Sequence, residues 1–156
     1  PSVSRGQVEV MKERAYEPLK GNGDIEWKEL NAAACRVMQD YCGEFKNEEL
    51  LKVGLLWLED LRSNEGPRVS VDTPHKLMRT LEVHNILTCD EMIIHASLAR
   101  RASSRHLGFF RLDFPEPDPP EWHKWVTIQR EQGDVRPGEL PIDFWKPMME
   151  NYERHR

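Results

Sequence analysis

The feature that most constrains the fold is a long run without proline or glycine, between Pro74 and Gly108. Thr73 can cap a helix whose first position is Pro74, where the missing N–H costs nothing. A helix over residues 74–103 would be roughly 45 Å long at about 1.5 Å per residue. The side chains that trace one line along it, and that we expect in the middle of a bundle, are Leu77, Leu81, Asn85, Thr88, Met92, His95 and Ala99.

Two shorter amphipathic segments precede this run. Residues 25–42 have apolar side chains at steps of three and four, which predicts a helix capped by Asp24. A further helix begins after Asn47, a favourable cap. Its expected buried stripe is Leu50, Val53, Trp57 and Leu61, widened by Leu51, Leu55 and Leu58. Three helices with short connections predict an antiparallel three-helix bundle, similar to a spectrin repeat, over residues 25–103.

The segments on either side of this bundle have a different character. Residues 1–24 form an N-terminal lead-in with weak helical character. Residues 104–156 form an extended tail rich in proline and aromatic residues; most of the 11 prolines lie after residue 114, so we expect no helix there. A strand over residues 126–130, a turn at residues 131–134 and a returning strand predict a small β-hairpin. The predicted fold is mainly α, with this tail packing on the bundle.

Composition limits the classes of function. A chain of 156 residues with 38% hydrophobic residues suits one domain with a modest core. The net charge of −5 argues against a mainly electrostatic nucleic-acid binder, so we expect no nucleic-acid partner, although a binder that uses a local basic patch stays open as a third alternative. No apolar run approaches the ~18 residues of a membrane span, so direct membrane insertion is not expected. Cys35, Cys42 and Cys89, an odd number without C-x-x-C spacing, indicate a reducing compartment, hence a cytoplasmic location, and are expected to be buried.

The sequence contains no complete pattern for a cofactor or metal. Gly21 and Gly23 begin a G-x-G spacing, but the third glycine of a dinucleotide loop is replaced by Glu26 and no hydrophobic strand precedes the turn. His84 and His95 share a helix face, yet eleven residues correspond to about 16 Å, too far for one metal ion.

A catalytic nucleophile is also not indicated. Ser103 and Ser104 lie close to His106, but such near neighbours in sequence seldom form a triad, and no orienting acid or oxyanion loop is evident. We therefore expect no catalytic, cofactor-binding or metal-binding residues on this chain.

Residues 98–125, between the bundle and the tail, are the candidate docking segment. Residues 98–112 contain four arginines and no acid, and aromatic residues follow with little scaffold beneath them. Such residues form either a small core or a partner surface. Arg105, Arg111 and Asp113 could form a buried ion-pair set that holds the tail, because a guanidinium binds carboxylates bidentately. The candidate docking residues are Arg100, Arg101, Arg105, His106, Phe109, Arg111, Asp113, Phe114, Trp122 and Trp125.

Several motifs together resemble one known family. They are Glu26-Trp-Lys-Glu-Leu, Asn47-Glu-Glu-Leu-Leu, Leu77-Met-Arg-Thr-Leu-Glu-Val-His-Asn-Ile-Leu and, most specifically, Arg111-Leu-Asp-Phe-Pro-Glu-Pro-Asp. The region from about residue 8 to residue 150 resembles the C-terminal helical domain of the fumarate reductase and succinate dehydrogenase flavoproteins. That family also includes adenylylsulfate reductase alpha subunits and L-aspartate oxidases.

One departure from the family pattern favours a particular branch. Fumarate reductases and succinate dehydrogenases usually carry Arg-Gly-x-His before the last motif, but here the glycine falls on Leu107 and the histidine on Phe109. Residues 102–111 and the continuation to Leu140-Pro-Ile-Asp-Phe are more similar to the adenylylsulfate reductase branch.

The resemblance implies a parent enzyme with FAD-binding and capping domains that carry the flavin and substrate contacts. This chain would then hold no cofactor and would not be catalytic alone. Its implied partners are the FAD-binding domain of the same protein and an iron–sulfur subunit, with membrane association through the parent complex. An alternative of a different class stays open: a stand-alone protein–protein interaction module that uses the aromatic tail.

Overall fold

The computed structural model describes residues 3–21, 23–131, 134–142 and 145–155, and most of them are helical. The main helices are α1 (Arg5–Tyr16), α2 (Trp27–Tyr41), α3 (Glu48–Asp60), α4 (Pro74–Ala99) and α5 (Trp145–Arg154). Short helical turns are η1 (Glu17–Lys20), the π-helix η2 (Leu61–Glu65), η3 (Gly66–Arg68) and η4 (Pro120–Trp122). The strands form two small sheets: β1 (Phe45–Lys46) with β2 (Phe110–Arg111), and β3 (Lys124–Glu131) with β4 (Asp134–Pro141).

The predicted mainly helical class and the small hairpin are confirmed. β3 and β4 pair antiparallel, from Lys124 opposite Pro141 to Glu131 opposite Asp134. The two residues expected at the tip of the turn, 132 and 133, lie outside the described residues. The parallel pairing of β1 with β2 was not predicted, because two-residue strands leave no periodic pattern in a sequence.

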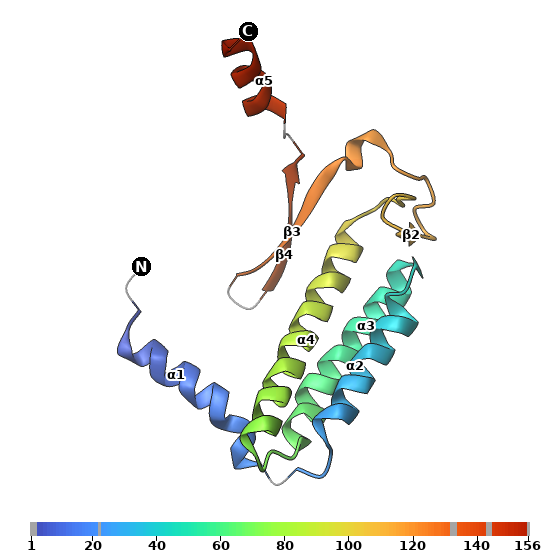
Figure 1. Cartoon of the computed structure of the whole chain (residues 1–156). Coiled ribbons are helices and arrows are strands. Elements are labelled where there is room, and N and C mark those ends of the chain that lie inside the picture. The colour runs from blue at the N-terminus through green and yellow to red at the C-terminus, as the bar shows by residue number, and fades with distance from the viewer. Residues whose placement is uncertain (1–2, 22, 132–133, 143–144, 156) are drawn as a thin grey trace.

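α2, α3 and α4 lie side by side and share one hydrophobic core (Figure 1). The core includes Leu30, Ala34, Val37, Leu51, Leu58, Leu61, Val83, Leu87 and Ile94. Gly54 of α3 lies close to both neighbouring helices, since an added Cβ would lie 3.0 Å from Cβ of Tyr41 and 3.1 Å from Cδ1 of Ile94. The helices therefore pack with no room for a larger residue at this point.

The starts of the three core helices agree with the sequence in two cases. Asn47 accepts a hydrogen bond from the N–H of Leu50 at the start of α3 (2.8 Å), and Thr73 caps α4 with Pro74 in first position. The prediction for α2 was wrong. Its cap is Glu26, whereas Asp24 pairs with the guanidinium of Arg68 at 2.8 Å. Asp24 and Glu26 both precede the helix, but Asp24 is occupied by its ion pair with the distant Arg68.

The predicted buried faces of α3 and α4 were partly wrong. On α4 the buried face differs from the expected one and lies beside it on the helix surface. The buried residues are Thr80, Val83, Leu87, Asp90, Ile94 and Ser97. On α3, Val53 and Trp57 are exposed, and Gly54 is buried instead. Both helices carry apolar residues on nearly every side, so periodicity alone does not single out the face that packs.

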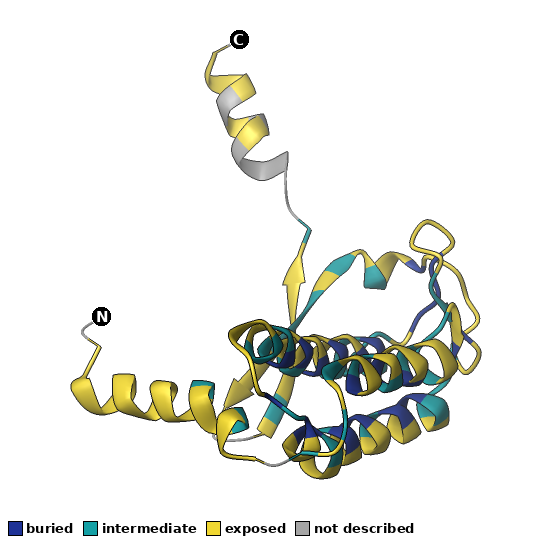
Figure 2. Cartoon of the chain, turned by 60° about the horizontal axis from the view of Figure 1, so that its bottom comes forward, coloured by how far each residue is buried: buried dark blue, intermediate teal, exposed yellow. Residues whose placement is uncertain are grey.

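The two ends of the chain project from the core. None of the side chains of α1 is buried, and α1 and α5 point away from the bundle (Figure 2). The helix α5 corrects the expectation that the tail has no helix: its only proline, Pro147, lies in the first turn, where proline is tolerated. α4 also ends earlier than predicted, at Ala99 rather than near residue 103.

Three further observations bear on function. Cys35 and Cys89 are exposed and Cys42 is half-buried, so the expectation of three buried cysteines was wrong. Of the described helices, none combines the length and apolar character needed to cross a bilayer. Within the described ranges, no three His, Cys, Asp or Glu side chains are grouped so that they could hold a metal ion.

Candidate functional site

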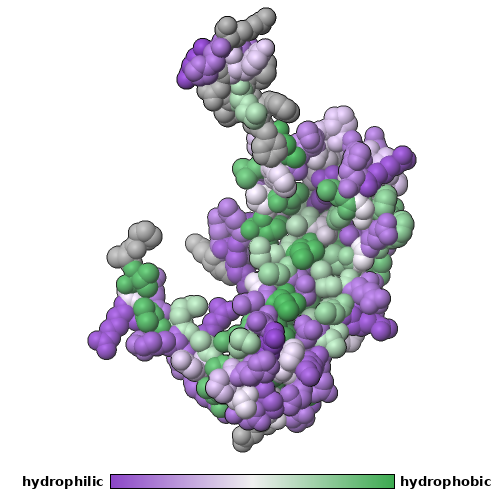
Figure 3. Space-filling view, viewed as in Figure 1, coloured by the Kyte–Doolittle hydropathy of each residue, from purple (hydrophilic) through white to green (hydrophobic). Residues whose placement is uncertain are grey.

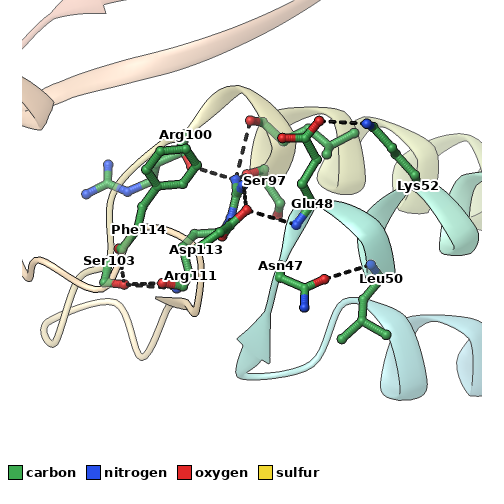
Figure 4. A network of polar contacts seen from close by, with 11 residues as sticks. Asn47, Glu48, Leu50, Lys52, Ser97, Arg100, Ser103, Arg111, Asp113 and Phe114 are labelled. Atoms are coloured by element: carbon green, nitrogen blue, oxygen red, sulfur yellow. Dashed lines mark hydrogen bonds and ion pairs between the residues drawn. The ribbon is translucent and has the colours of Figure 1, made fainter.

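Arg111 lies against the end of α4 and is the largest of the fully buried side chains, at 1% exposure. Its Nη1 donates to the carbonyl oxygens of Ser97, Leu98 (3.3 Å) and Arg100 (2.8 Å), as Figure 4 shows in part. The last carbonyls of a helix have no partner within it and carry the negative end of its dipole. A buried cation here satisfies both, and it explains why α4 ends at Ala99 although the sequence permits a longer helix.

Asp113 completes the arrangement on the other side. Its carboxylate accepts from Nε (2.8 Å) and Nη2 (2.7 Å) of Arg111, and from the backbone N–H of Glu48, the first residue of α3 (3.0 Å). The start of a helix carries unpaired N–H groups and favours a negative charge. We call this pair the Arg111–Asp113 clamp: its cation holds the end of α4 and its anion holds the start of α3.

The clamp perturbs the carboxyl strongly. The hydrogen bonds from Arg111 outweigh the opposing effect of burial and, with the N–H of Glu48, lower the pKa of Asp113 to about 2. The side chain of Asp113 is 28% exposed, so water screens it only in part. The carboxylate is therefore ionised at every physiological pH.

Ser103 holds the clamp segment from within. Its hydroxyl donates to the carbonyl of Phe114 (2.8 Å) and accepts from the N–H of Arg111 (2.9 Å). In the neighbouring pairing of β1 and β2, the rings of Phe45 and Phe110 stack at 5.1 Å. The hydroxyl of Ser103 is thus occupied by backbone groups and serves the local fold.

A cavity of about 770 Å³ opens beside the clamp, between α4, residues 104–109 and the start of β3. We call it the aromatic cavity. Five of the candidate docking residues line it: Arg100, His106, Phe109, Trp122 and Trp125. Apolar residues gather over the centre of this face of the molecule (Figure 3).

Arg100 is the polar centre of the aromatic cavity. Its guanidinium lies 5.9 Å from the ring of Phe109 and 5.8 Å from the ring of Trp122. Burial lowers the pKa of Arg100, against the opposing charge of Asp118. Its Nε is buried and has no hydrogen-bond partner among the residues that the structure describes. An unsatisfied buried donor costs about 1–3 kcal/mol, so an acceptor entering the cavity would be favoured.

The remaining candidate residues are distributed around these two features. The ring of Phe114 lies 5.0 Å from the guanidinium of Arg111 and so belongs to the clamp. The side chain of Arg101 is exposed. Arg105 corrects the expected ion-pair set: its side chain is exposed, and its backbone N–H donates to Asp118 (3.2 Å) rather than its guanidinium to Asp113.

Two residues of the site were not predicted. Lys46 is 6% exposed and its Nζ lies 4.3 Å from the ring of Phe109; burial lowers its pKa. Asp118 has a φ of 51° and accepts the N–H of Arg105, which fixes the turn before Pro119. The sequence signal for Asp118 was its place before two prolines, whereas Lys46 is brought here by tertiary packing alone.

The turn at Gly23 does not fit the phosphates of a flavin dinucleotide. At Gly23, an added Cβ would lie 1.9 Å from the carbonyl oxygen of Arg68, so the glycine is required by contact with the chain itself. The space that a phosphate would need at this turn is filled by the backbone of η3. We therefore derive no chemistry through a cofactor on this chain.

Together these features define a mainly helical domain with a clamped helix end and an aromatic cavity beside it. A family model described as the fumarate reductase flavoprotein C-terminus matches residues 31–154. The chain belongs to this family of flavoprotein C-terminal regions. No curated protein sequence matches the chain significantly.

Solved structures of similar fold come from several branches of the family. The FrdA chain of E. coli quinol fumarate reductase has a TM-score of 0.74 at 20% identity, and the match covers 92% of this chain and 26% of that one. An adenosine-5-phosphosulfate reductase in complex with sulfite has a TM-score of 0.79 at 20% identity, and the match covers 90% of this chain and 25% of that one. The Mycobacterium smegmatis Sdh1 complex has a TM-score of 0.73 at 23% identity, and the match covers 90% of this chain and 25% of that one. The chain thus spans about a quarter of the length of these proteins, and the likeness shows the fold.

Proposed function

We propose that this chain is the C-terminal helical domain of an FAD-dependent oxidoreductase, with a structural and docking role and no catalysis of its own. The observation that carries the proposal is the family match over residues 31–154, combined with an aromatic cavity lined by candidate docking residues. In this view residues 25–103 form an antiparallel three-helix bundle, and residues 104–156 a tail that shapes its docking face.

The docking face is the aromatic cavity and its surroundings. Large apolar side chains remain exposed on it, including Ile93 at 49%, Trp125 at 54% and Leu140 at 54%. Contiguous exposed apolar surface on a domain marks an interaction site. Aromatic and arginine side chains are also the groups that most often dominate binding energy. The FAD-binding domain of the parent enzyme is the proposed occupant, with an iron–sulfur subunit as a further partner.

The lining of the cavity supports the adenylylsulfate reductase branch. Leu107 and Phe109, which replace the usual glycine and histidine, both line the aromatic cavity. At these two positions the chain thus presents apolar groups to the occupant of the aromatic cavity. We propose that the parent enzyme acts on a sulfur compound rather than on a dicarboxylate, and that it works in the cytoplasm, with membrane association through its complex.

Spectroscopy of the purified chain tests the first part of this proposal. The chain should show no flavin absorbance after addition of FAD and desalting, and no turnover of fumarate, succinate or adenylylsulfate. An intact flavoprotein of the same family serves as the positive control. Stoichiometric retention of FAD by the chain would overturn the assignment.

A further inference from the structure

A second cavity, of about 840 Å³ and open to solvent, lies nearer the start of α4, between the end of α1, η1, η2, η3, α4 and the β3–β4 hairpin. We call it the basic cavity. Its lining includes four cationic side chains and two carboxylates. The cations are Arg14, Lys20, Arg62 and Arg130, and the carboxylates are Glu17 and Glu91. A cavity with this excess of positive charge favours an anion.

Two guanidiniums share one carboxylate at its centre. Arg62 Nη1 lies 2.7 Å from Oε2 of Glu91, and Arg130 Nη2 bonds the other oxygen. Burial acts to raise the pKa of Glu91, but the hydrogen bonds and charges of Arg62 and Arg130 prevail and lower it. The trio therefore carries one net positive charge. Each guanidinium has five N–H donors, so most of this donor capacity is not used by Glu91.

Arg62 is paired with Glu91 through Nη1, but its other terminal nitrogen has no partner in the described part of the chain. It lies in the π-helix η2, an irregularity that often marks functional positions. Its Nη2 is buried and finds no acceptor among the described residues. A buried donor without a partner is costly, so an acceptor that reaches it would be favoured.

The other polar groups around the cavity add donors. The guanidinium of Arg14 forms no ion pair or hydrogen bond with any described residue. His84 and His95 also line the cavity; burial, above all, lowers the pKa of both, and Arg14 and Arg62 lower that of His84 further. Both imidazoles are therefore neutral at pH 7, and an anion beside them would favour their protonation.

We propose that the basic cavity binds a carboxylate, placed between Arg62 and Arg130, that accepts the hydrogen bonds which Glu91 leaves unused. The planar guanidinium matches a carboxylate bidentately, which makes this group a better fit than a spherical anion. The carboxylate can belong to a free small acid or to an acidic side chain of another polypeptide segment. The inference does not depend on the docking role of the aromatic cavity, because the two cavities share no lining residue.

Amide and histidine NMR shifts of the chain, titrated with succinate at low salt, test this directly. Saturable shifts should occur around Arg62, His84 and His95, with a Kd near the millimolar range, that is about 4 kcal/mol of binding. The neutral diamide succinamide should produce none. Absence of saturation with succinate and with the peptide described below would overturn the proposal.

Variants give the matched comparison. Arg62→Gln should weaken the binding about tenfold or more, and Arg130→Gln, on an exposed strand residue, should do so without touching the core. Arg36→Gln removes an equal charge from an exposed pair with Asp40 and should leave binding within about twofold. Equal binding by all three variants would contradict the site.

A peptide arm separates the two sources of the carboxylate. The capped peptide acetyl-Ala-Glu-Ala-amide is compared with its glutamine analogue and with succinate. Binding of the glutamate peptide alone would assign the cavity to an acidic side chain of a polypeptide. Preference for succinate would assign it to a free acid. Both support a carboxylate site, whereas equal binding of the glutamine peptide would refute it.

Discussion

At the scale of single residues, Arg111 and Asp113 link the end of α4 to the start of α3. A buried guanidinium that takes carbonyls from one helix end, and a carboxylate that takes an N–H from another, serve two helix dipoles with one ion pair. The motif that marks the family in sequence is thus a structural clamp in space. Its two residues are only two positions apart, so the sequence alone could suggest their pairing. It could not show the carbonyls and N–H that they reach.

The clamp predicts a defined loss of stability in acid. The pKa of Asp113 lies below its ordinary value of 3.8, so its contribution is present above pH 3.8 and is lost as pH falls toward about 2. The shift corresponds to about 2 kcal/mol at neutral pH. Urea unfolding from pH 7 to pH 2 should show this loss in the wild type. Asp113→Asn should be less stable at pH 7 and should lose about 2 kcal/mol less than the wild type across that window, because the other carboxylates with lowered pKa values still titrate there.

A control makes this prediction specific. Asp40→Asn removes a carboxylate whose partner, Arg36, is 76% exposed, and it should change stability by less than about 0.5 kcal/mol. Equal effects of the two substitutions would show that the clamp has no special role.

Arg111→Ala should loosen the tail. Removing one partner of a buried ion pair costs about 3 kcal/mol, because the other groups lose their compensation. Hydrogen exchange should then accelerate at the end of α4 and over residues 102–118, and Trp122 should become more accessible to a quencher. Arg111→Lys keeps the charge but not the planar guanidinium, so its hydrogen-exchange rates over residues 102–118 should lie between those of the wild type and Arg111→Ala. Unchanged protection of residues 102–118 in Arg111→Ala would contradict this account.

At the scale of elements, close approach between helices matters more than amphipathic patterning. Gly54 on α3 lies against Tyr41 and Ile94, so Gly54→Ala should destabilise the fold by about 1–3 kcal/mol, although alanine favours helix formation. Gly6 on the exposed α1 has only Ser4 Oγ nearby, at 3.9 Å from an added Cβ. Gly6→Ala should therefore leave global stability unchanged or raise it by up to about 1 kcal/mol. Thermal unfolding of both variants checks the contrast, and a stabilised Gly54→Ala would contradict it.

Element starts were more predictable than element ends. Asn47 and Thr73 each cap a helix through a hydrogen bond from a backbone N–H three residues later, so the sequence predicts them locally. The end of α4 is bound by Arg111, twelve residues beyond Ala99. The one start that was wrong is that of α2, where the expected cap, Asp24, pairs with the distant Arg68. The buried faces of α3 and α4 were missed for the same reason: with apolar residues all round, the partners decide which face packs.

At the scale of the whole molecule, both cavities form between segments that are distant in sequence. The aromatic residues near α4 could be predicted as one group, because they lie within residues 98–125. Lys46 and the basic cavity could not, because η1, η2, α4 and the hairpin meet only in the folded chain. His84 and His95, rejected as a metal pair by their spacing, line one cavity without needing to share an ion.

The proposed docking role is tested most directly by binding of this chain to the separately produced FAD-binding part of the proposed parent flavoprotein, followed by size-exclusion chromatography and hydrogen exchange. We expect a one-to-one complex in which flavin absorbance elutes with the chain, with new protection around Arg100, Phe109 and Trp122. Trp122→Ala should weaken the complex at least about tenfold, whereas Trp57→Ala, on the exposed side of α3, should not. A complex without protection at the aromatic cavity, or no complex at all, would contradict it.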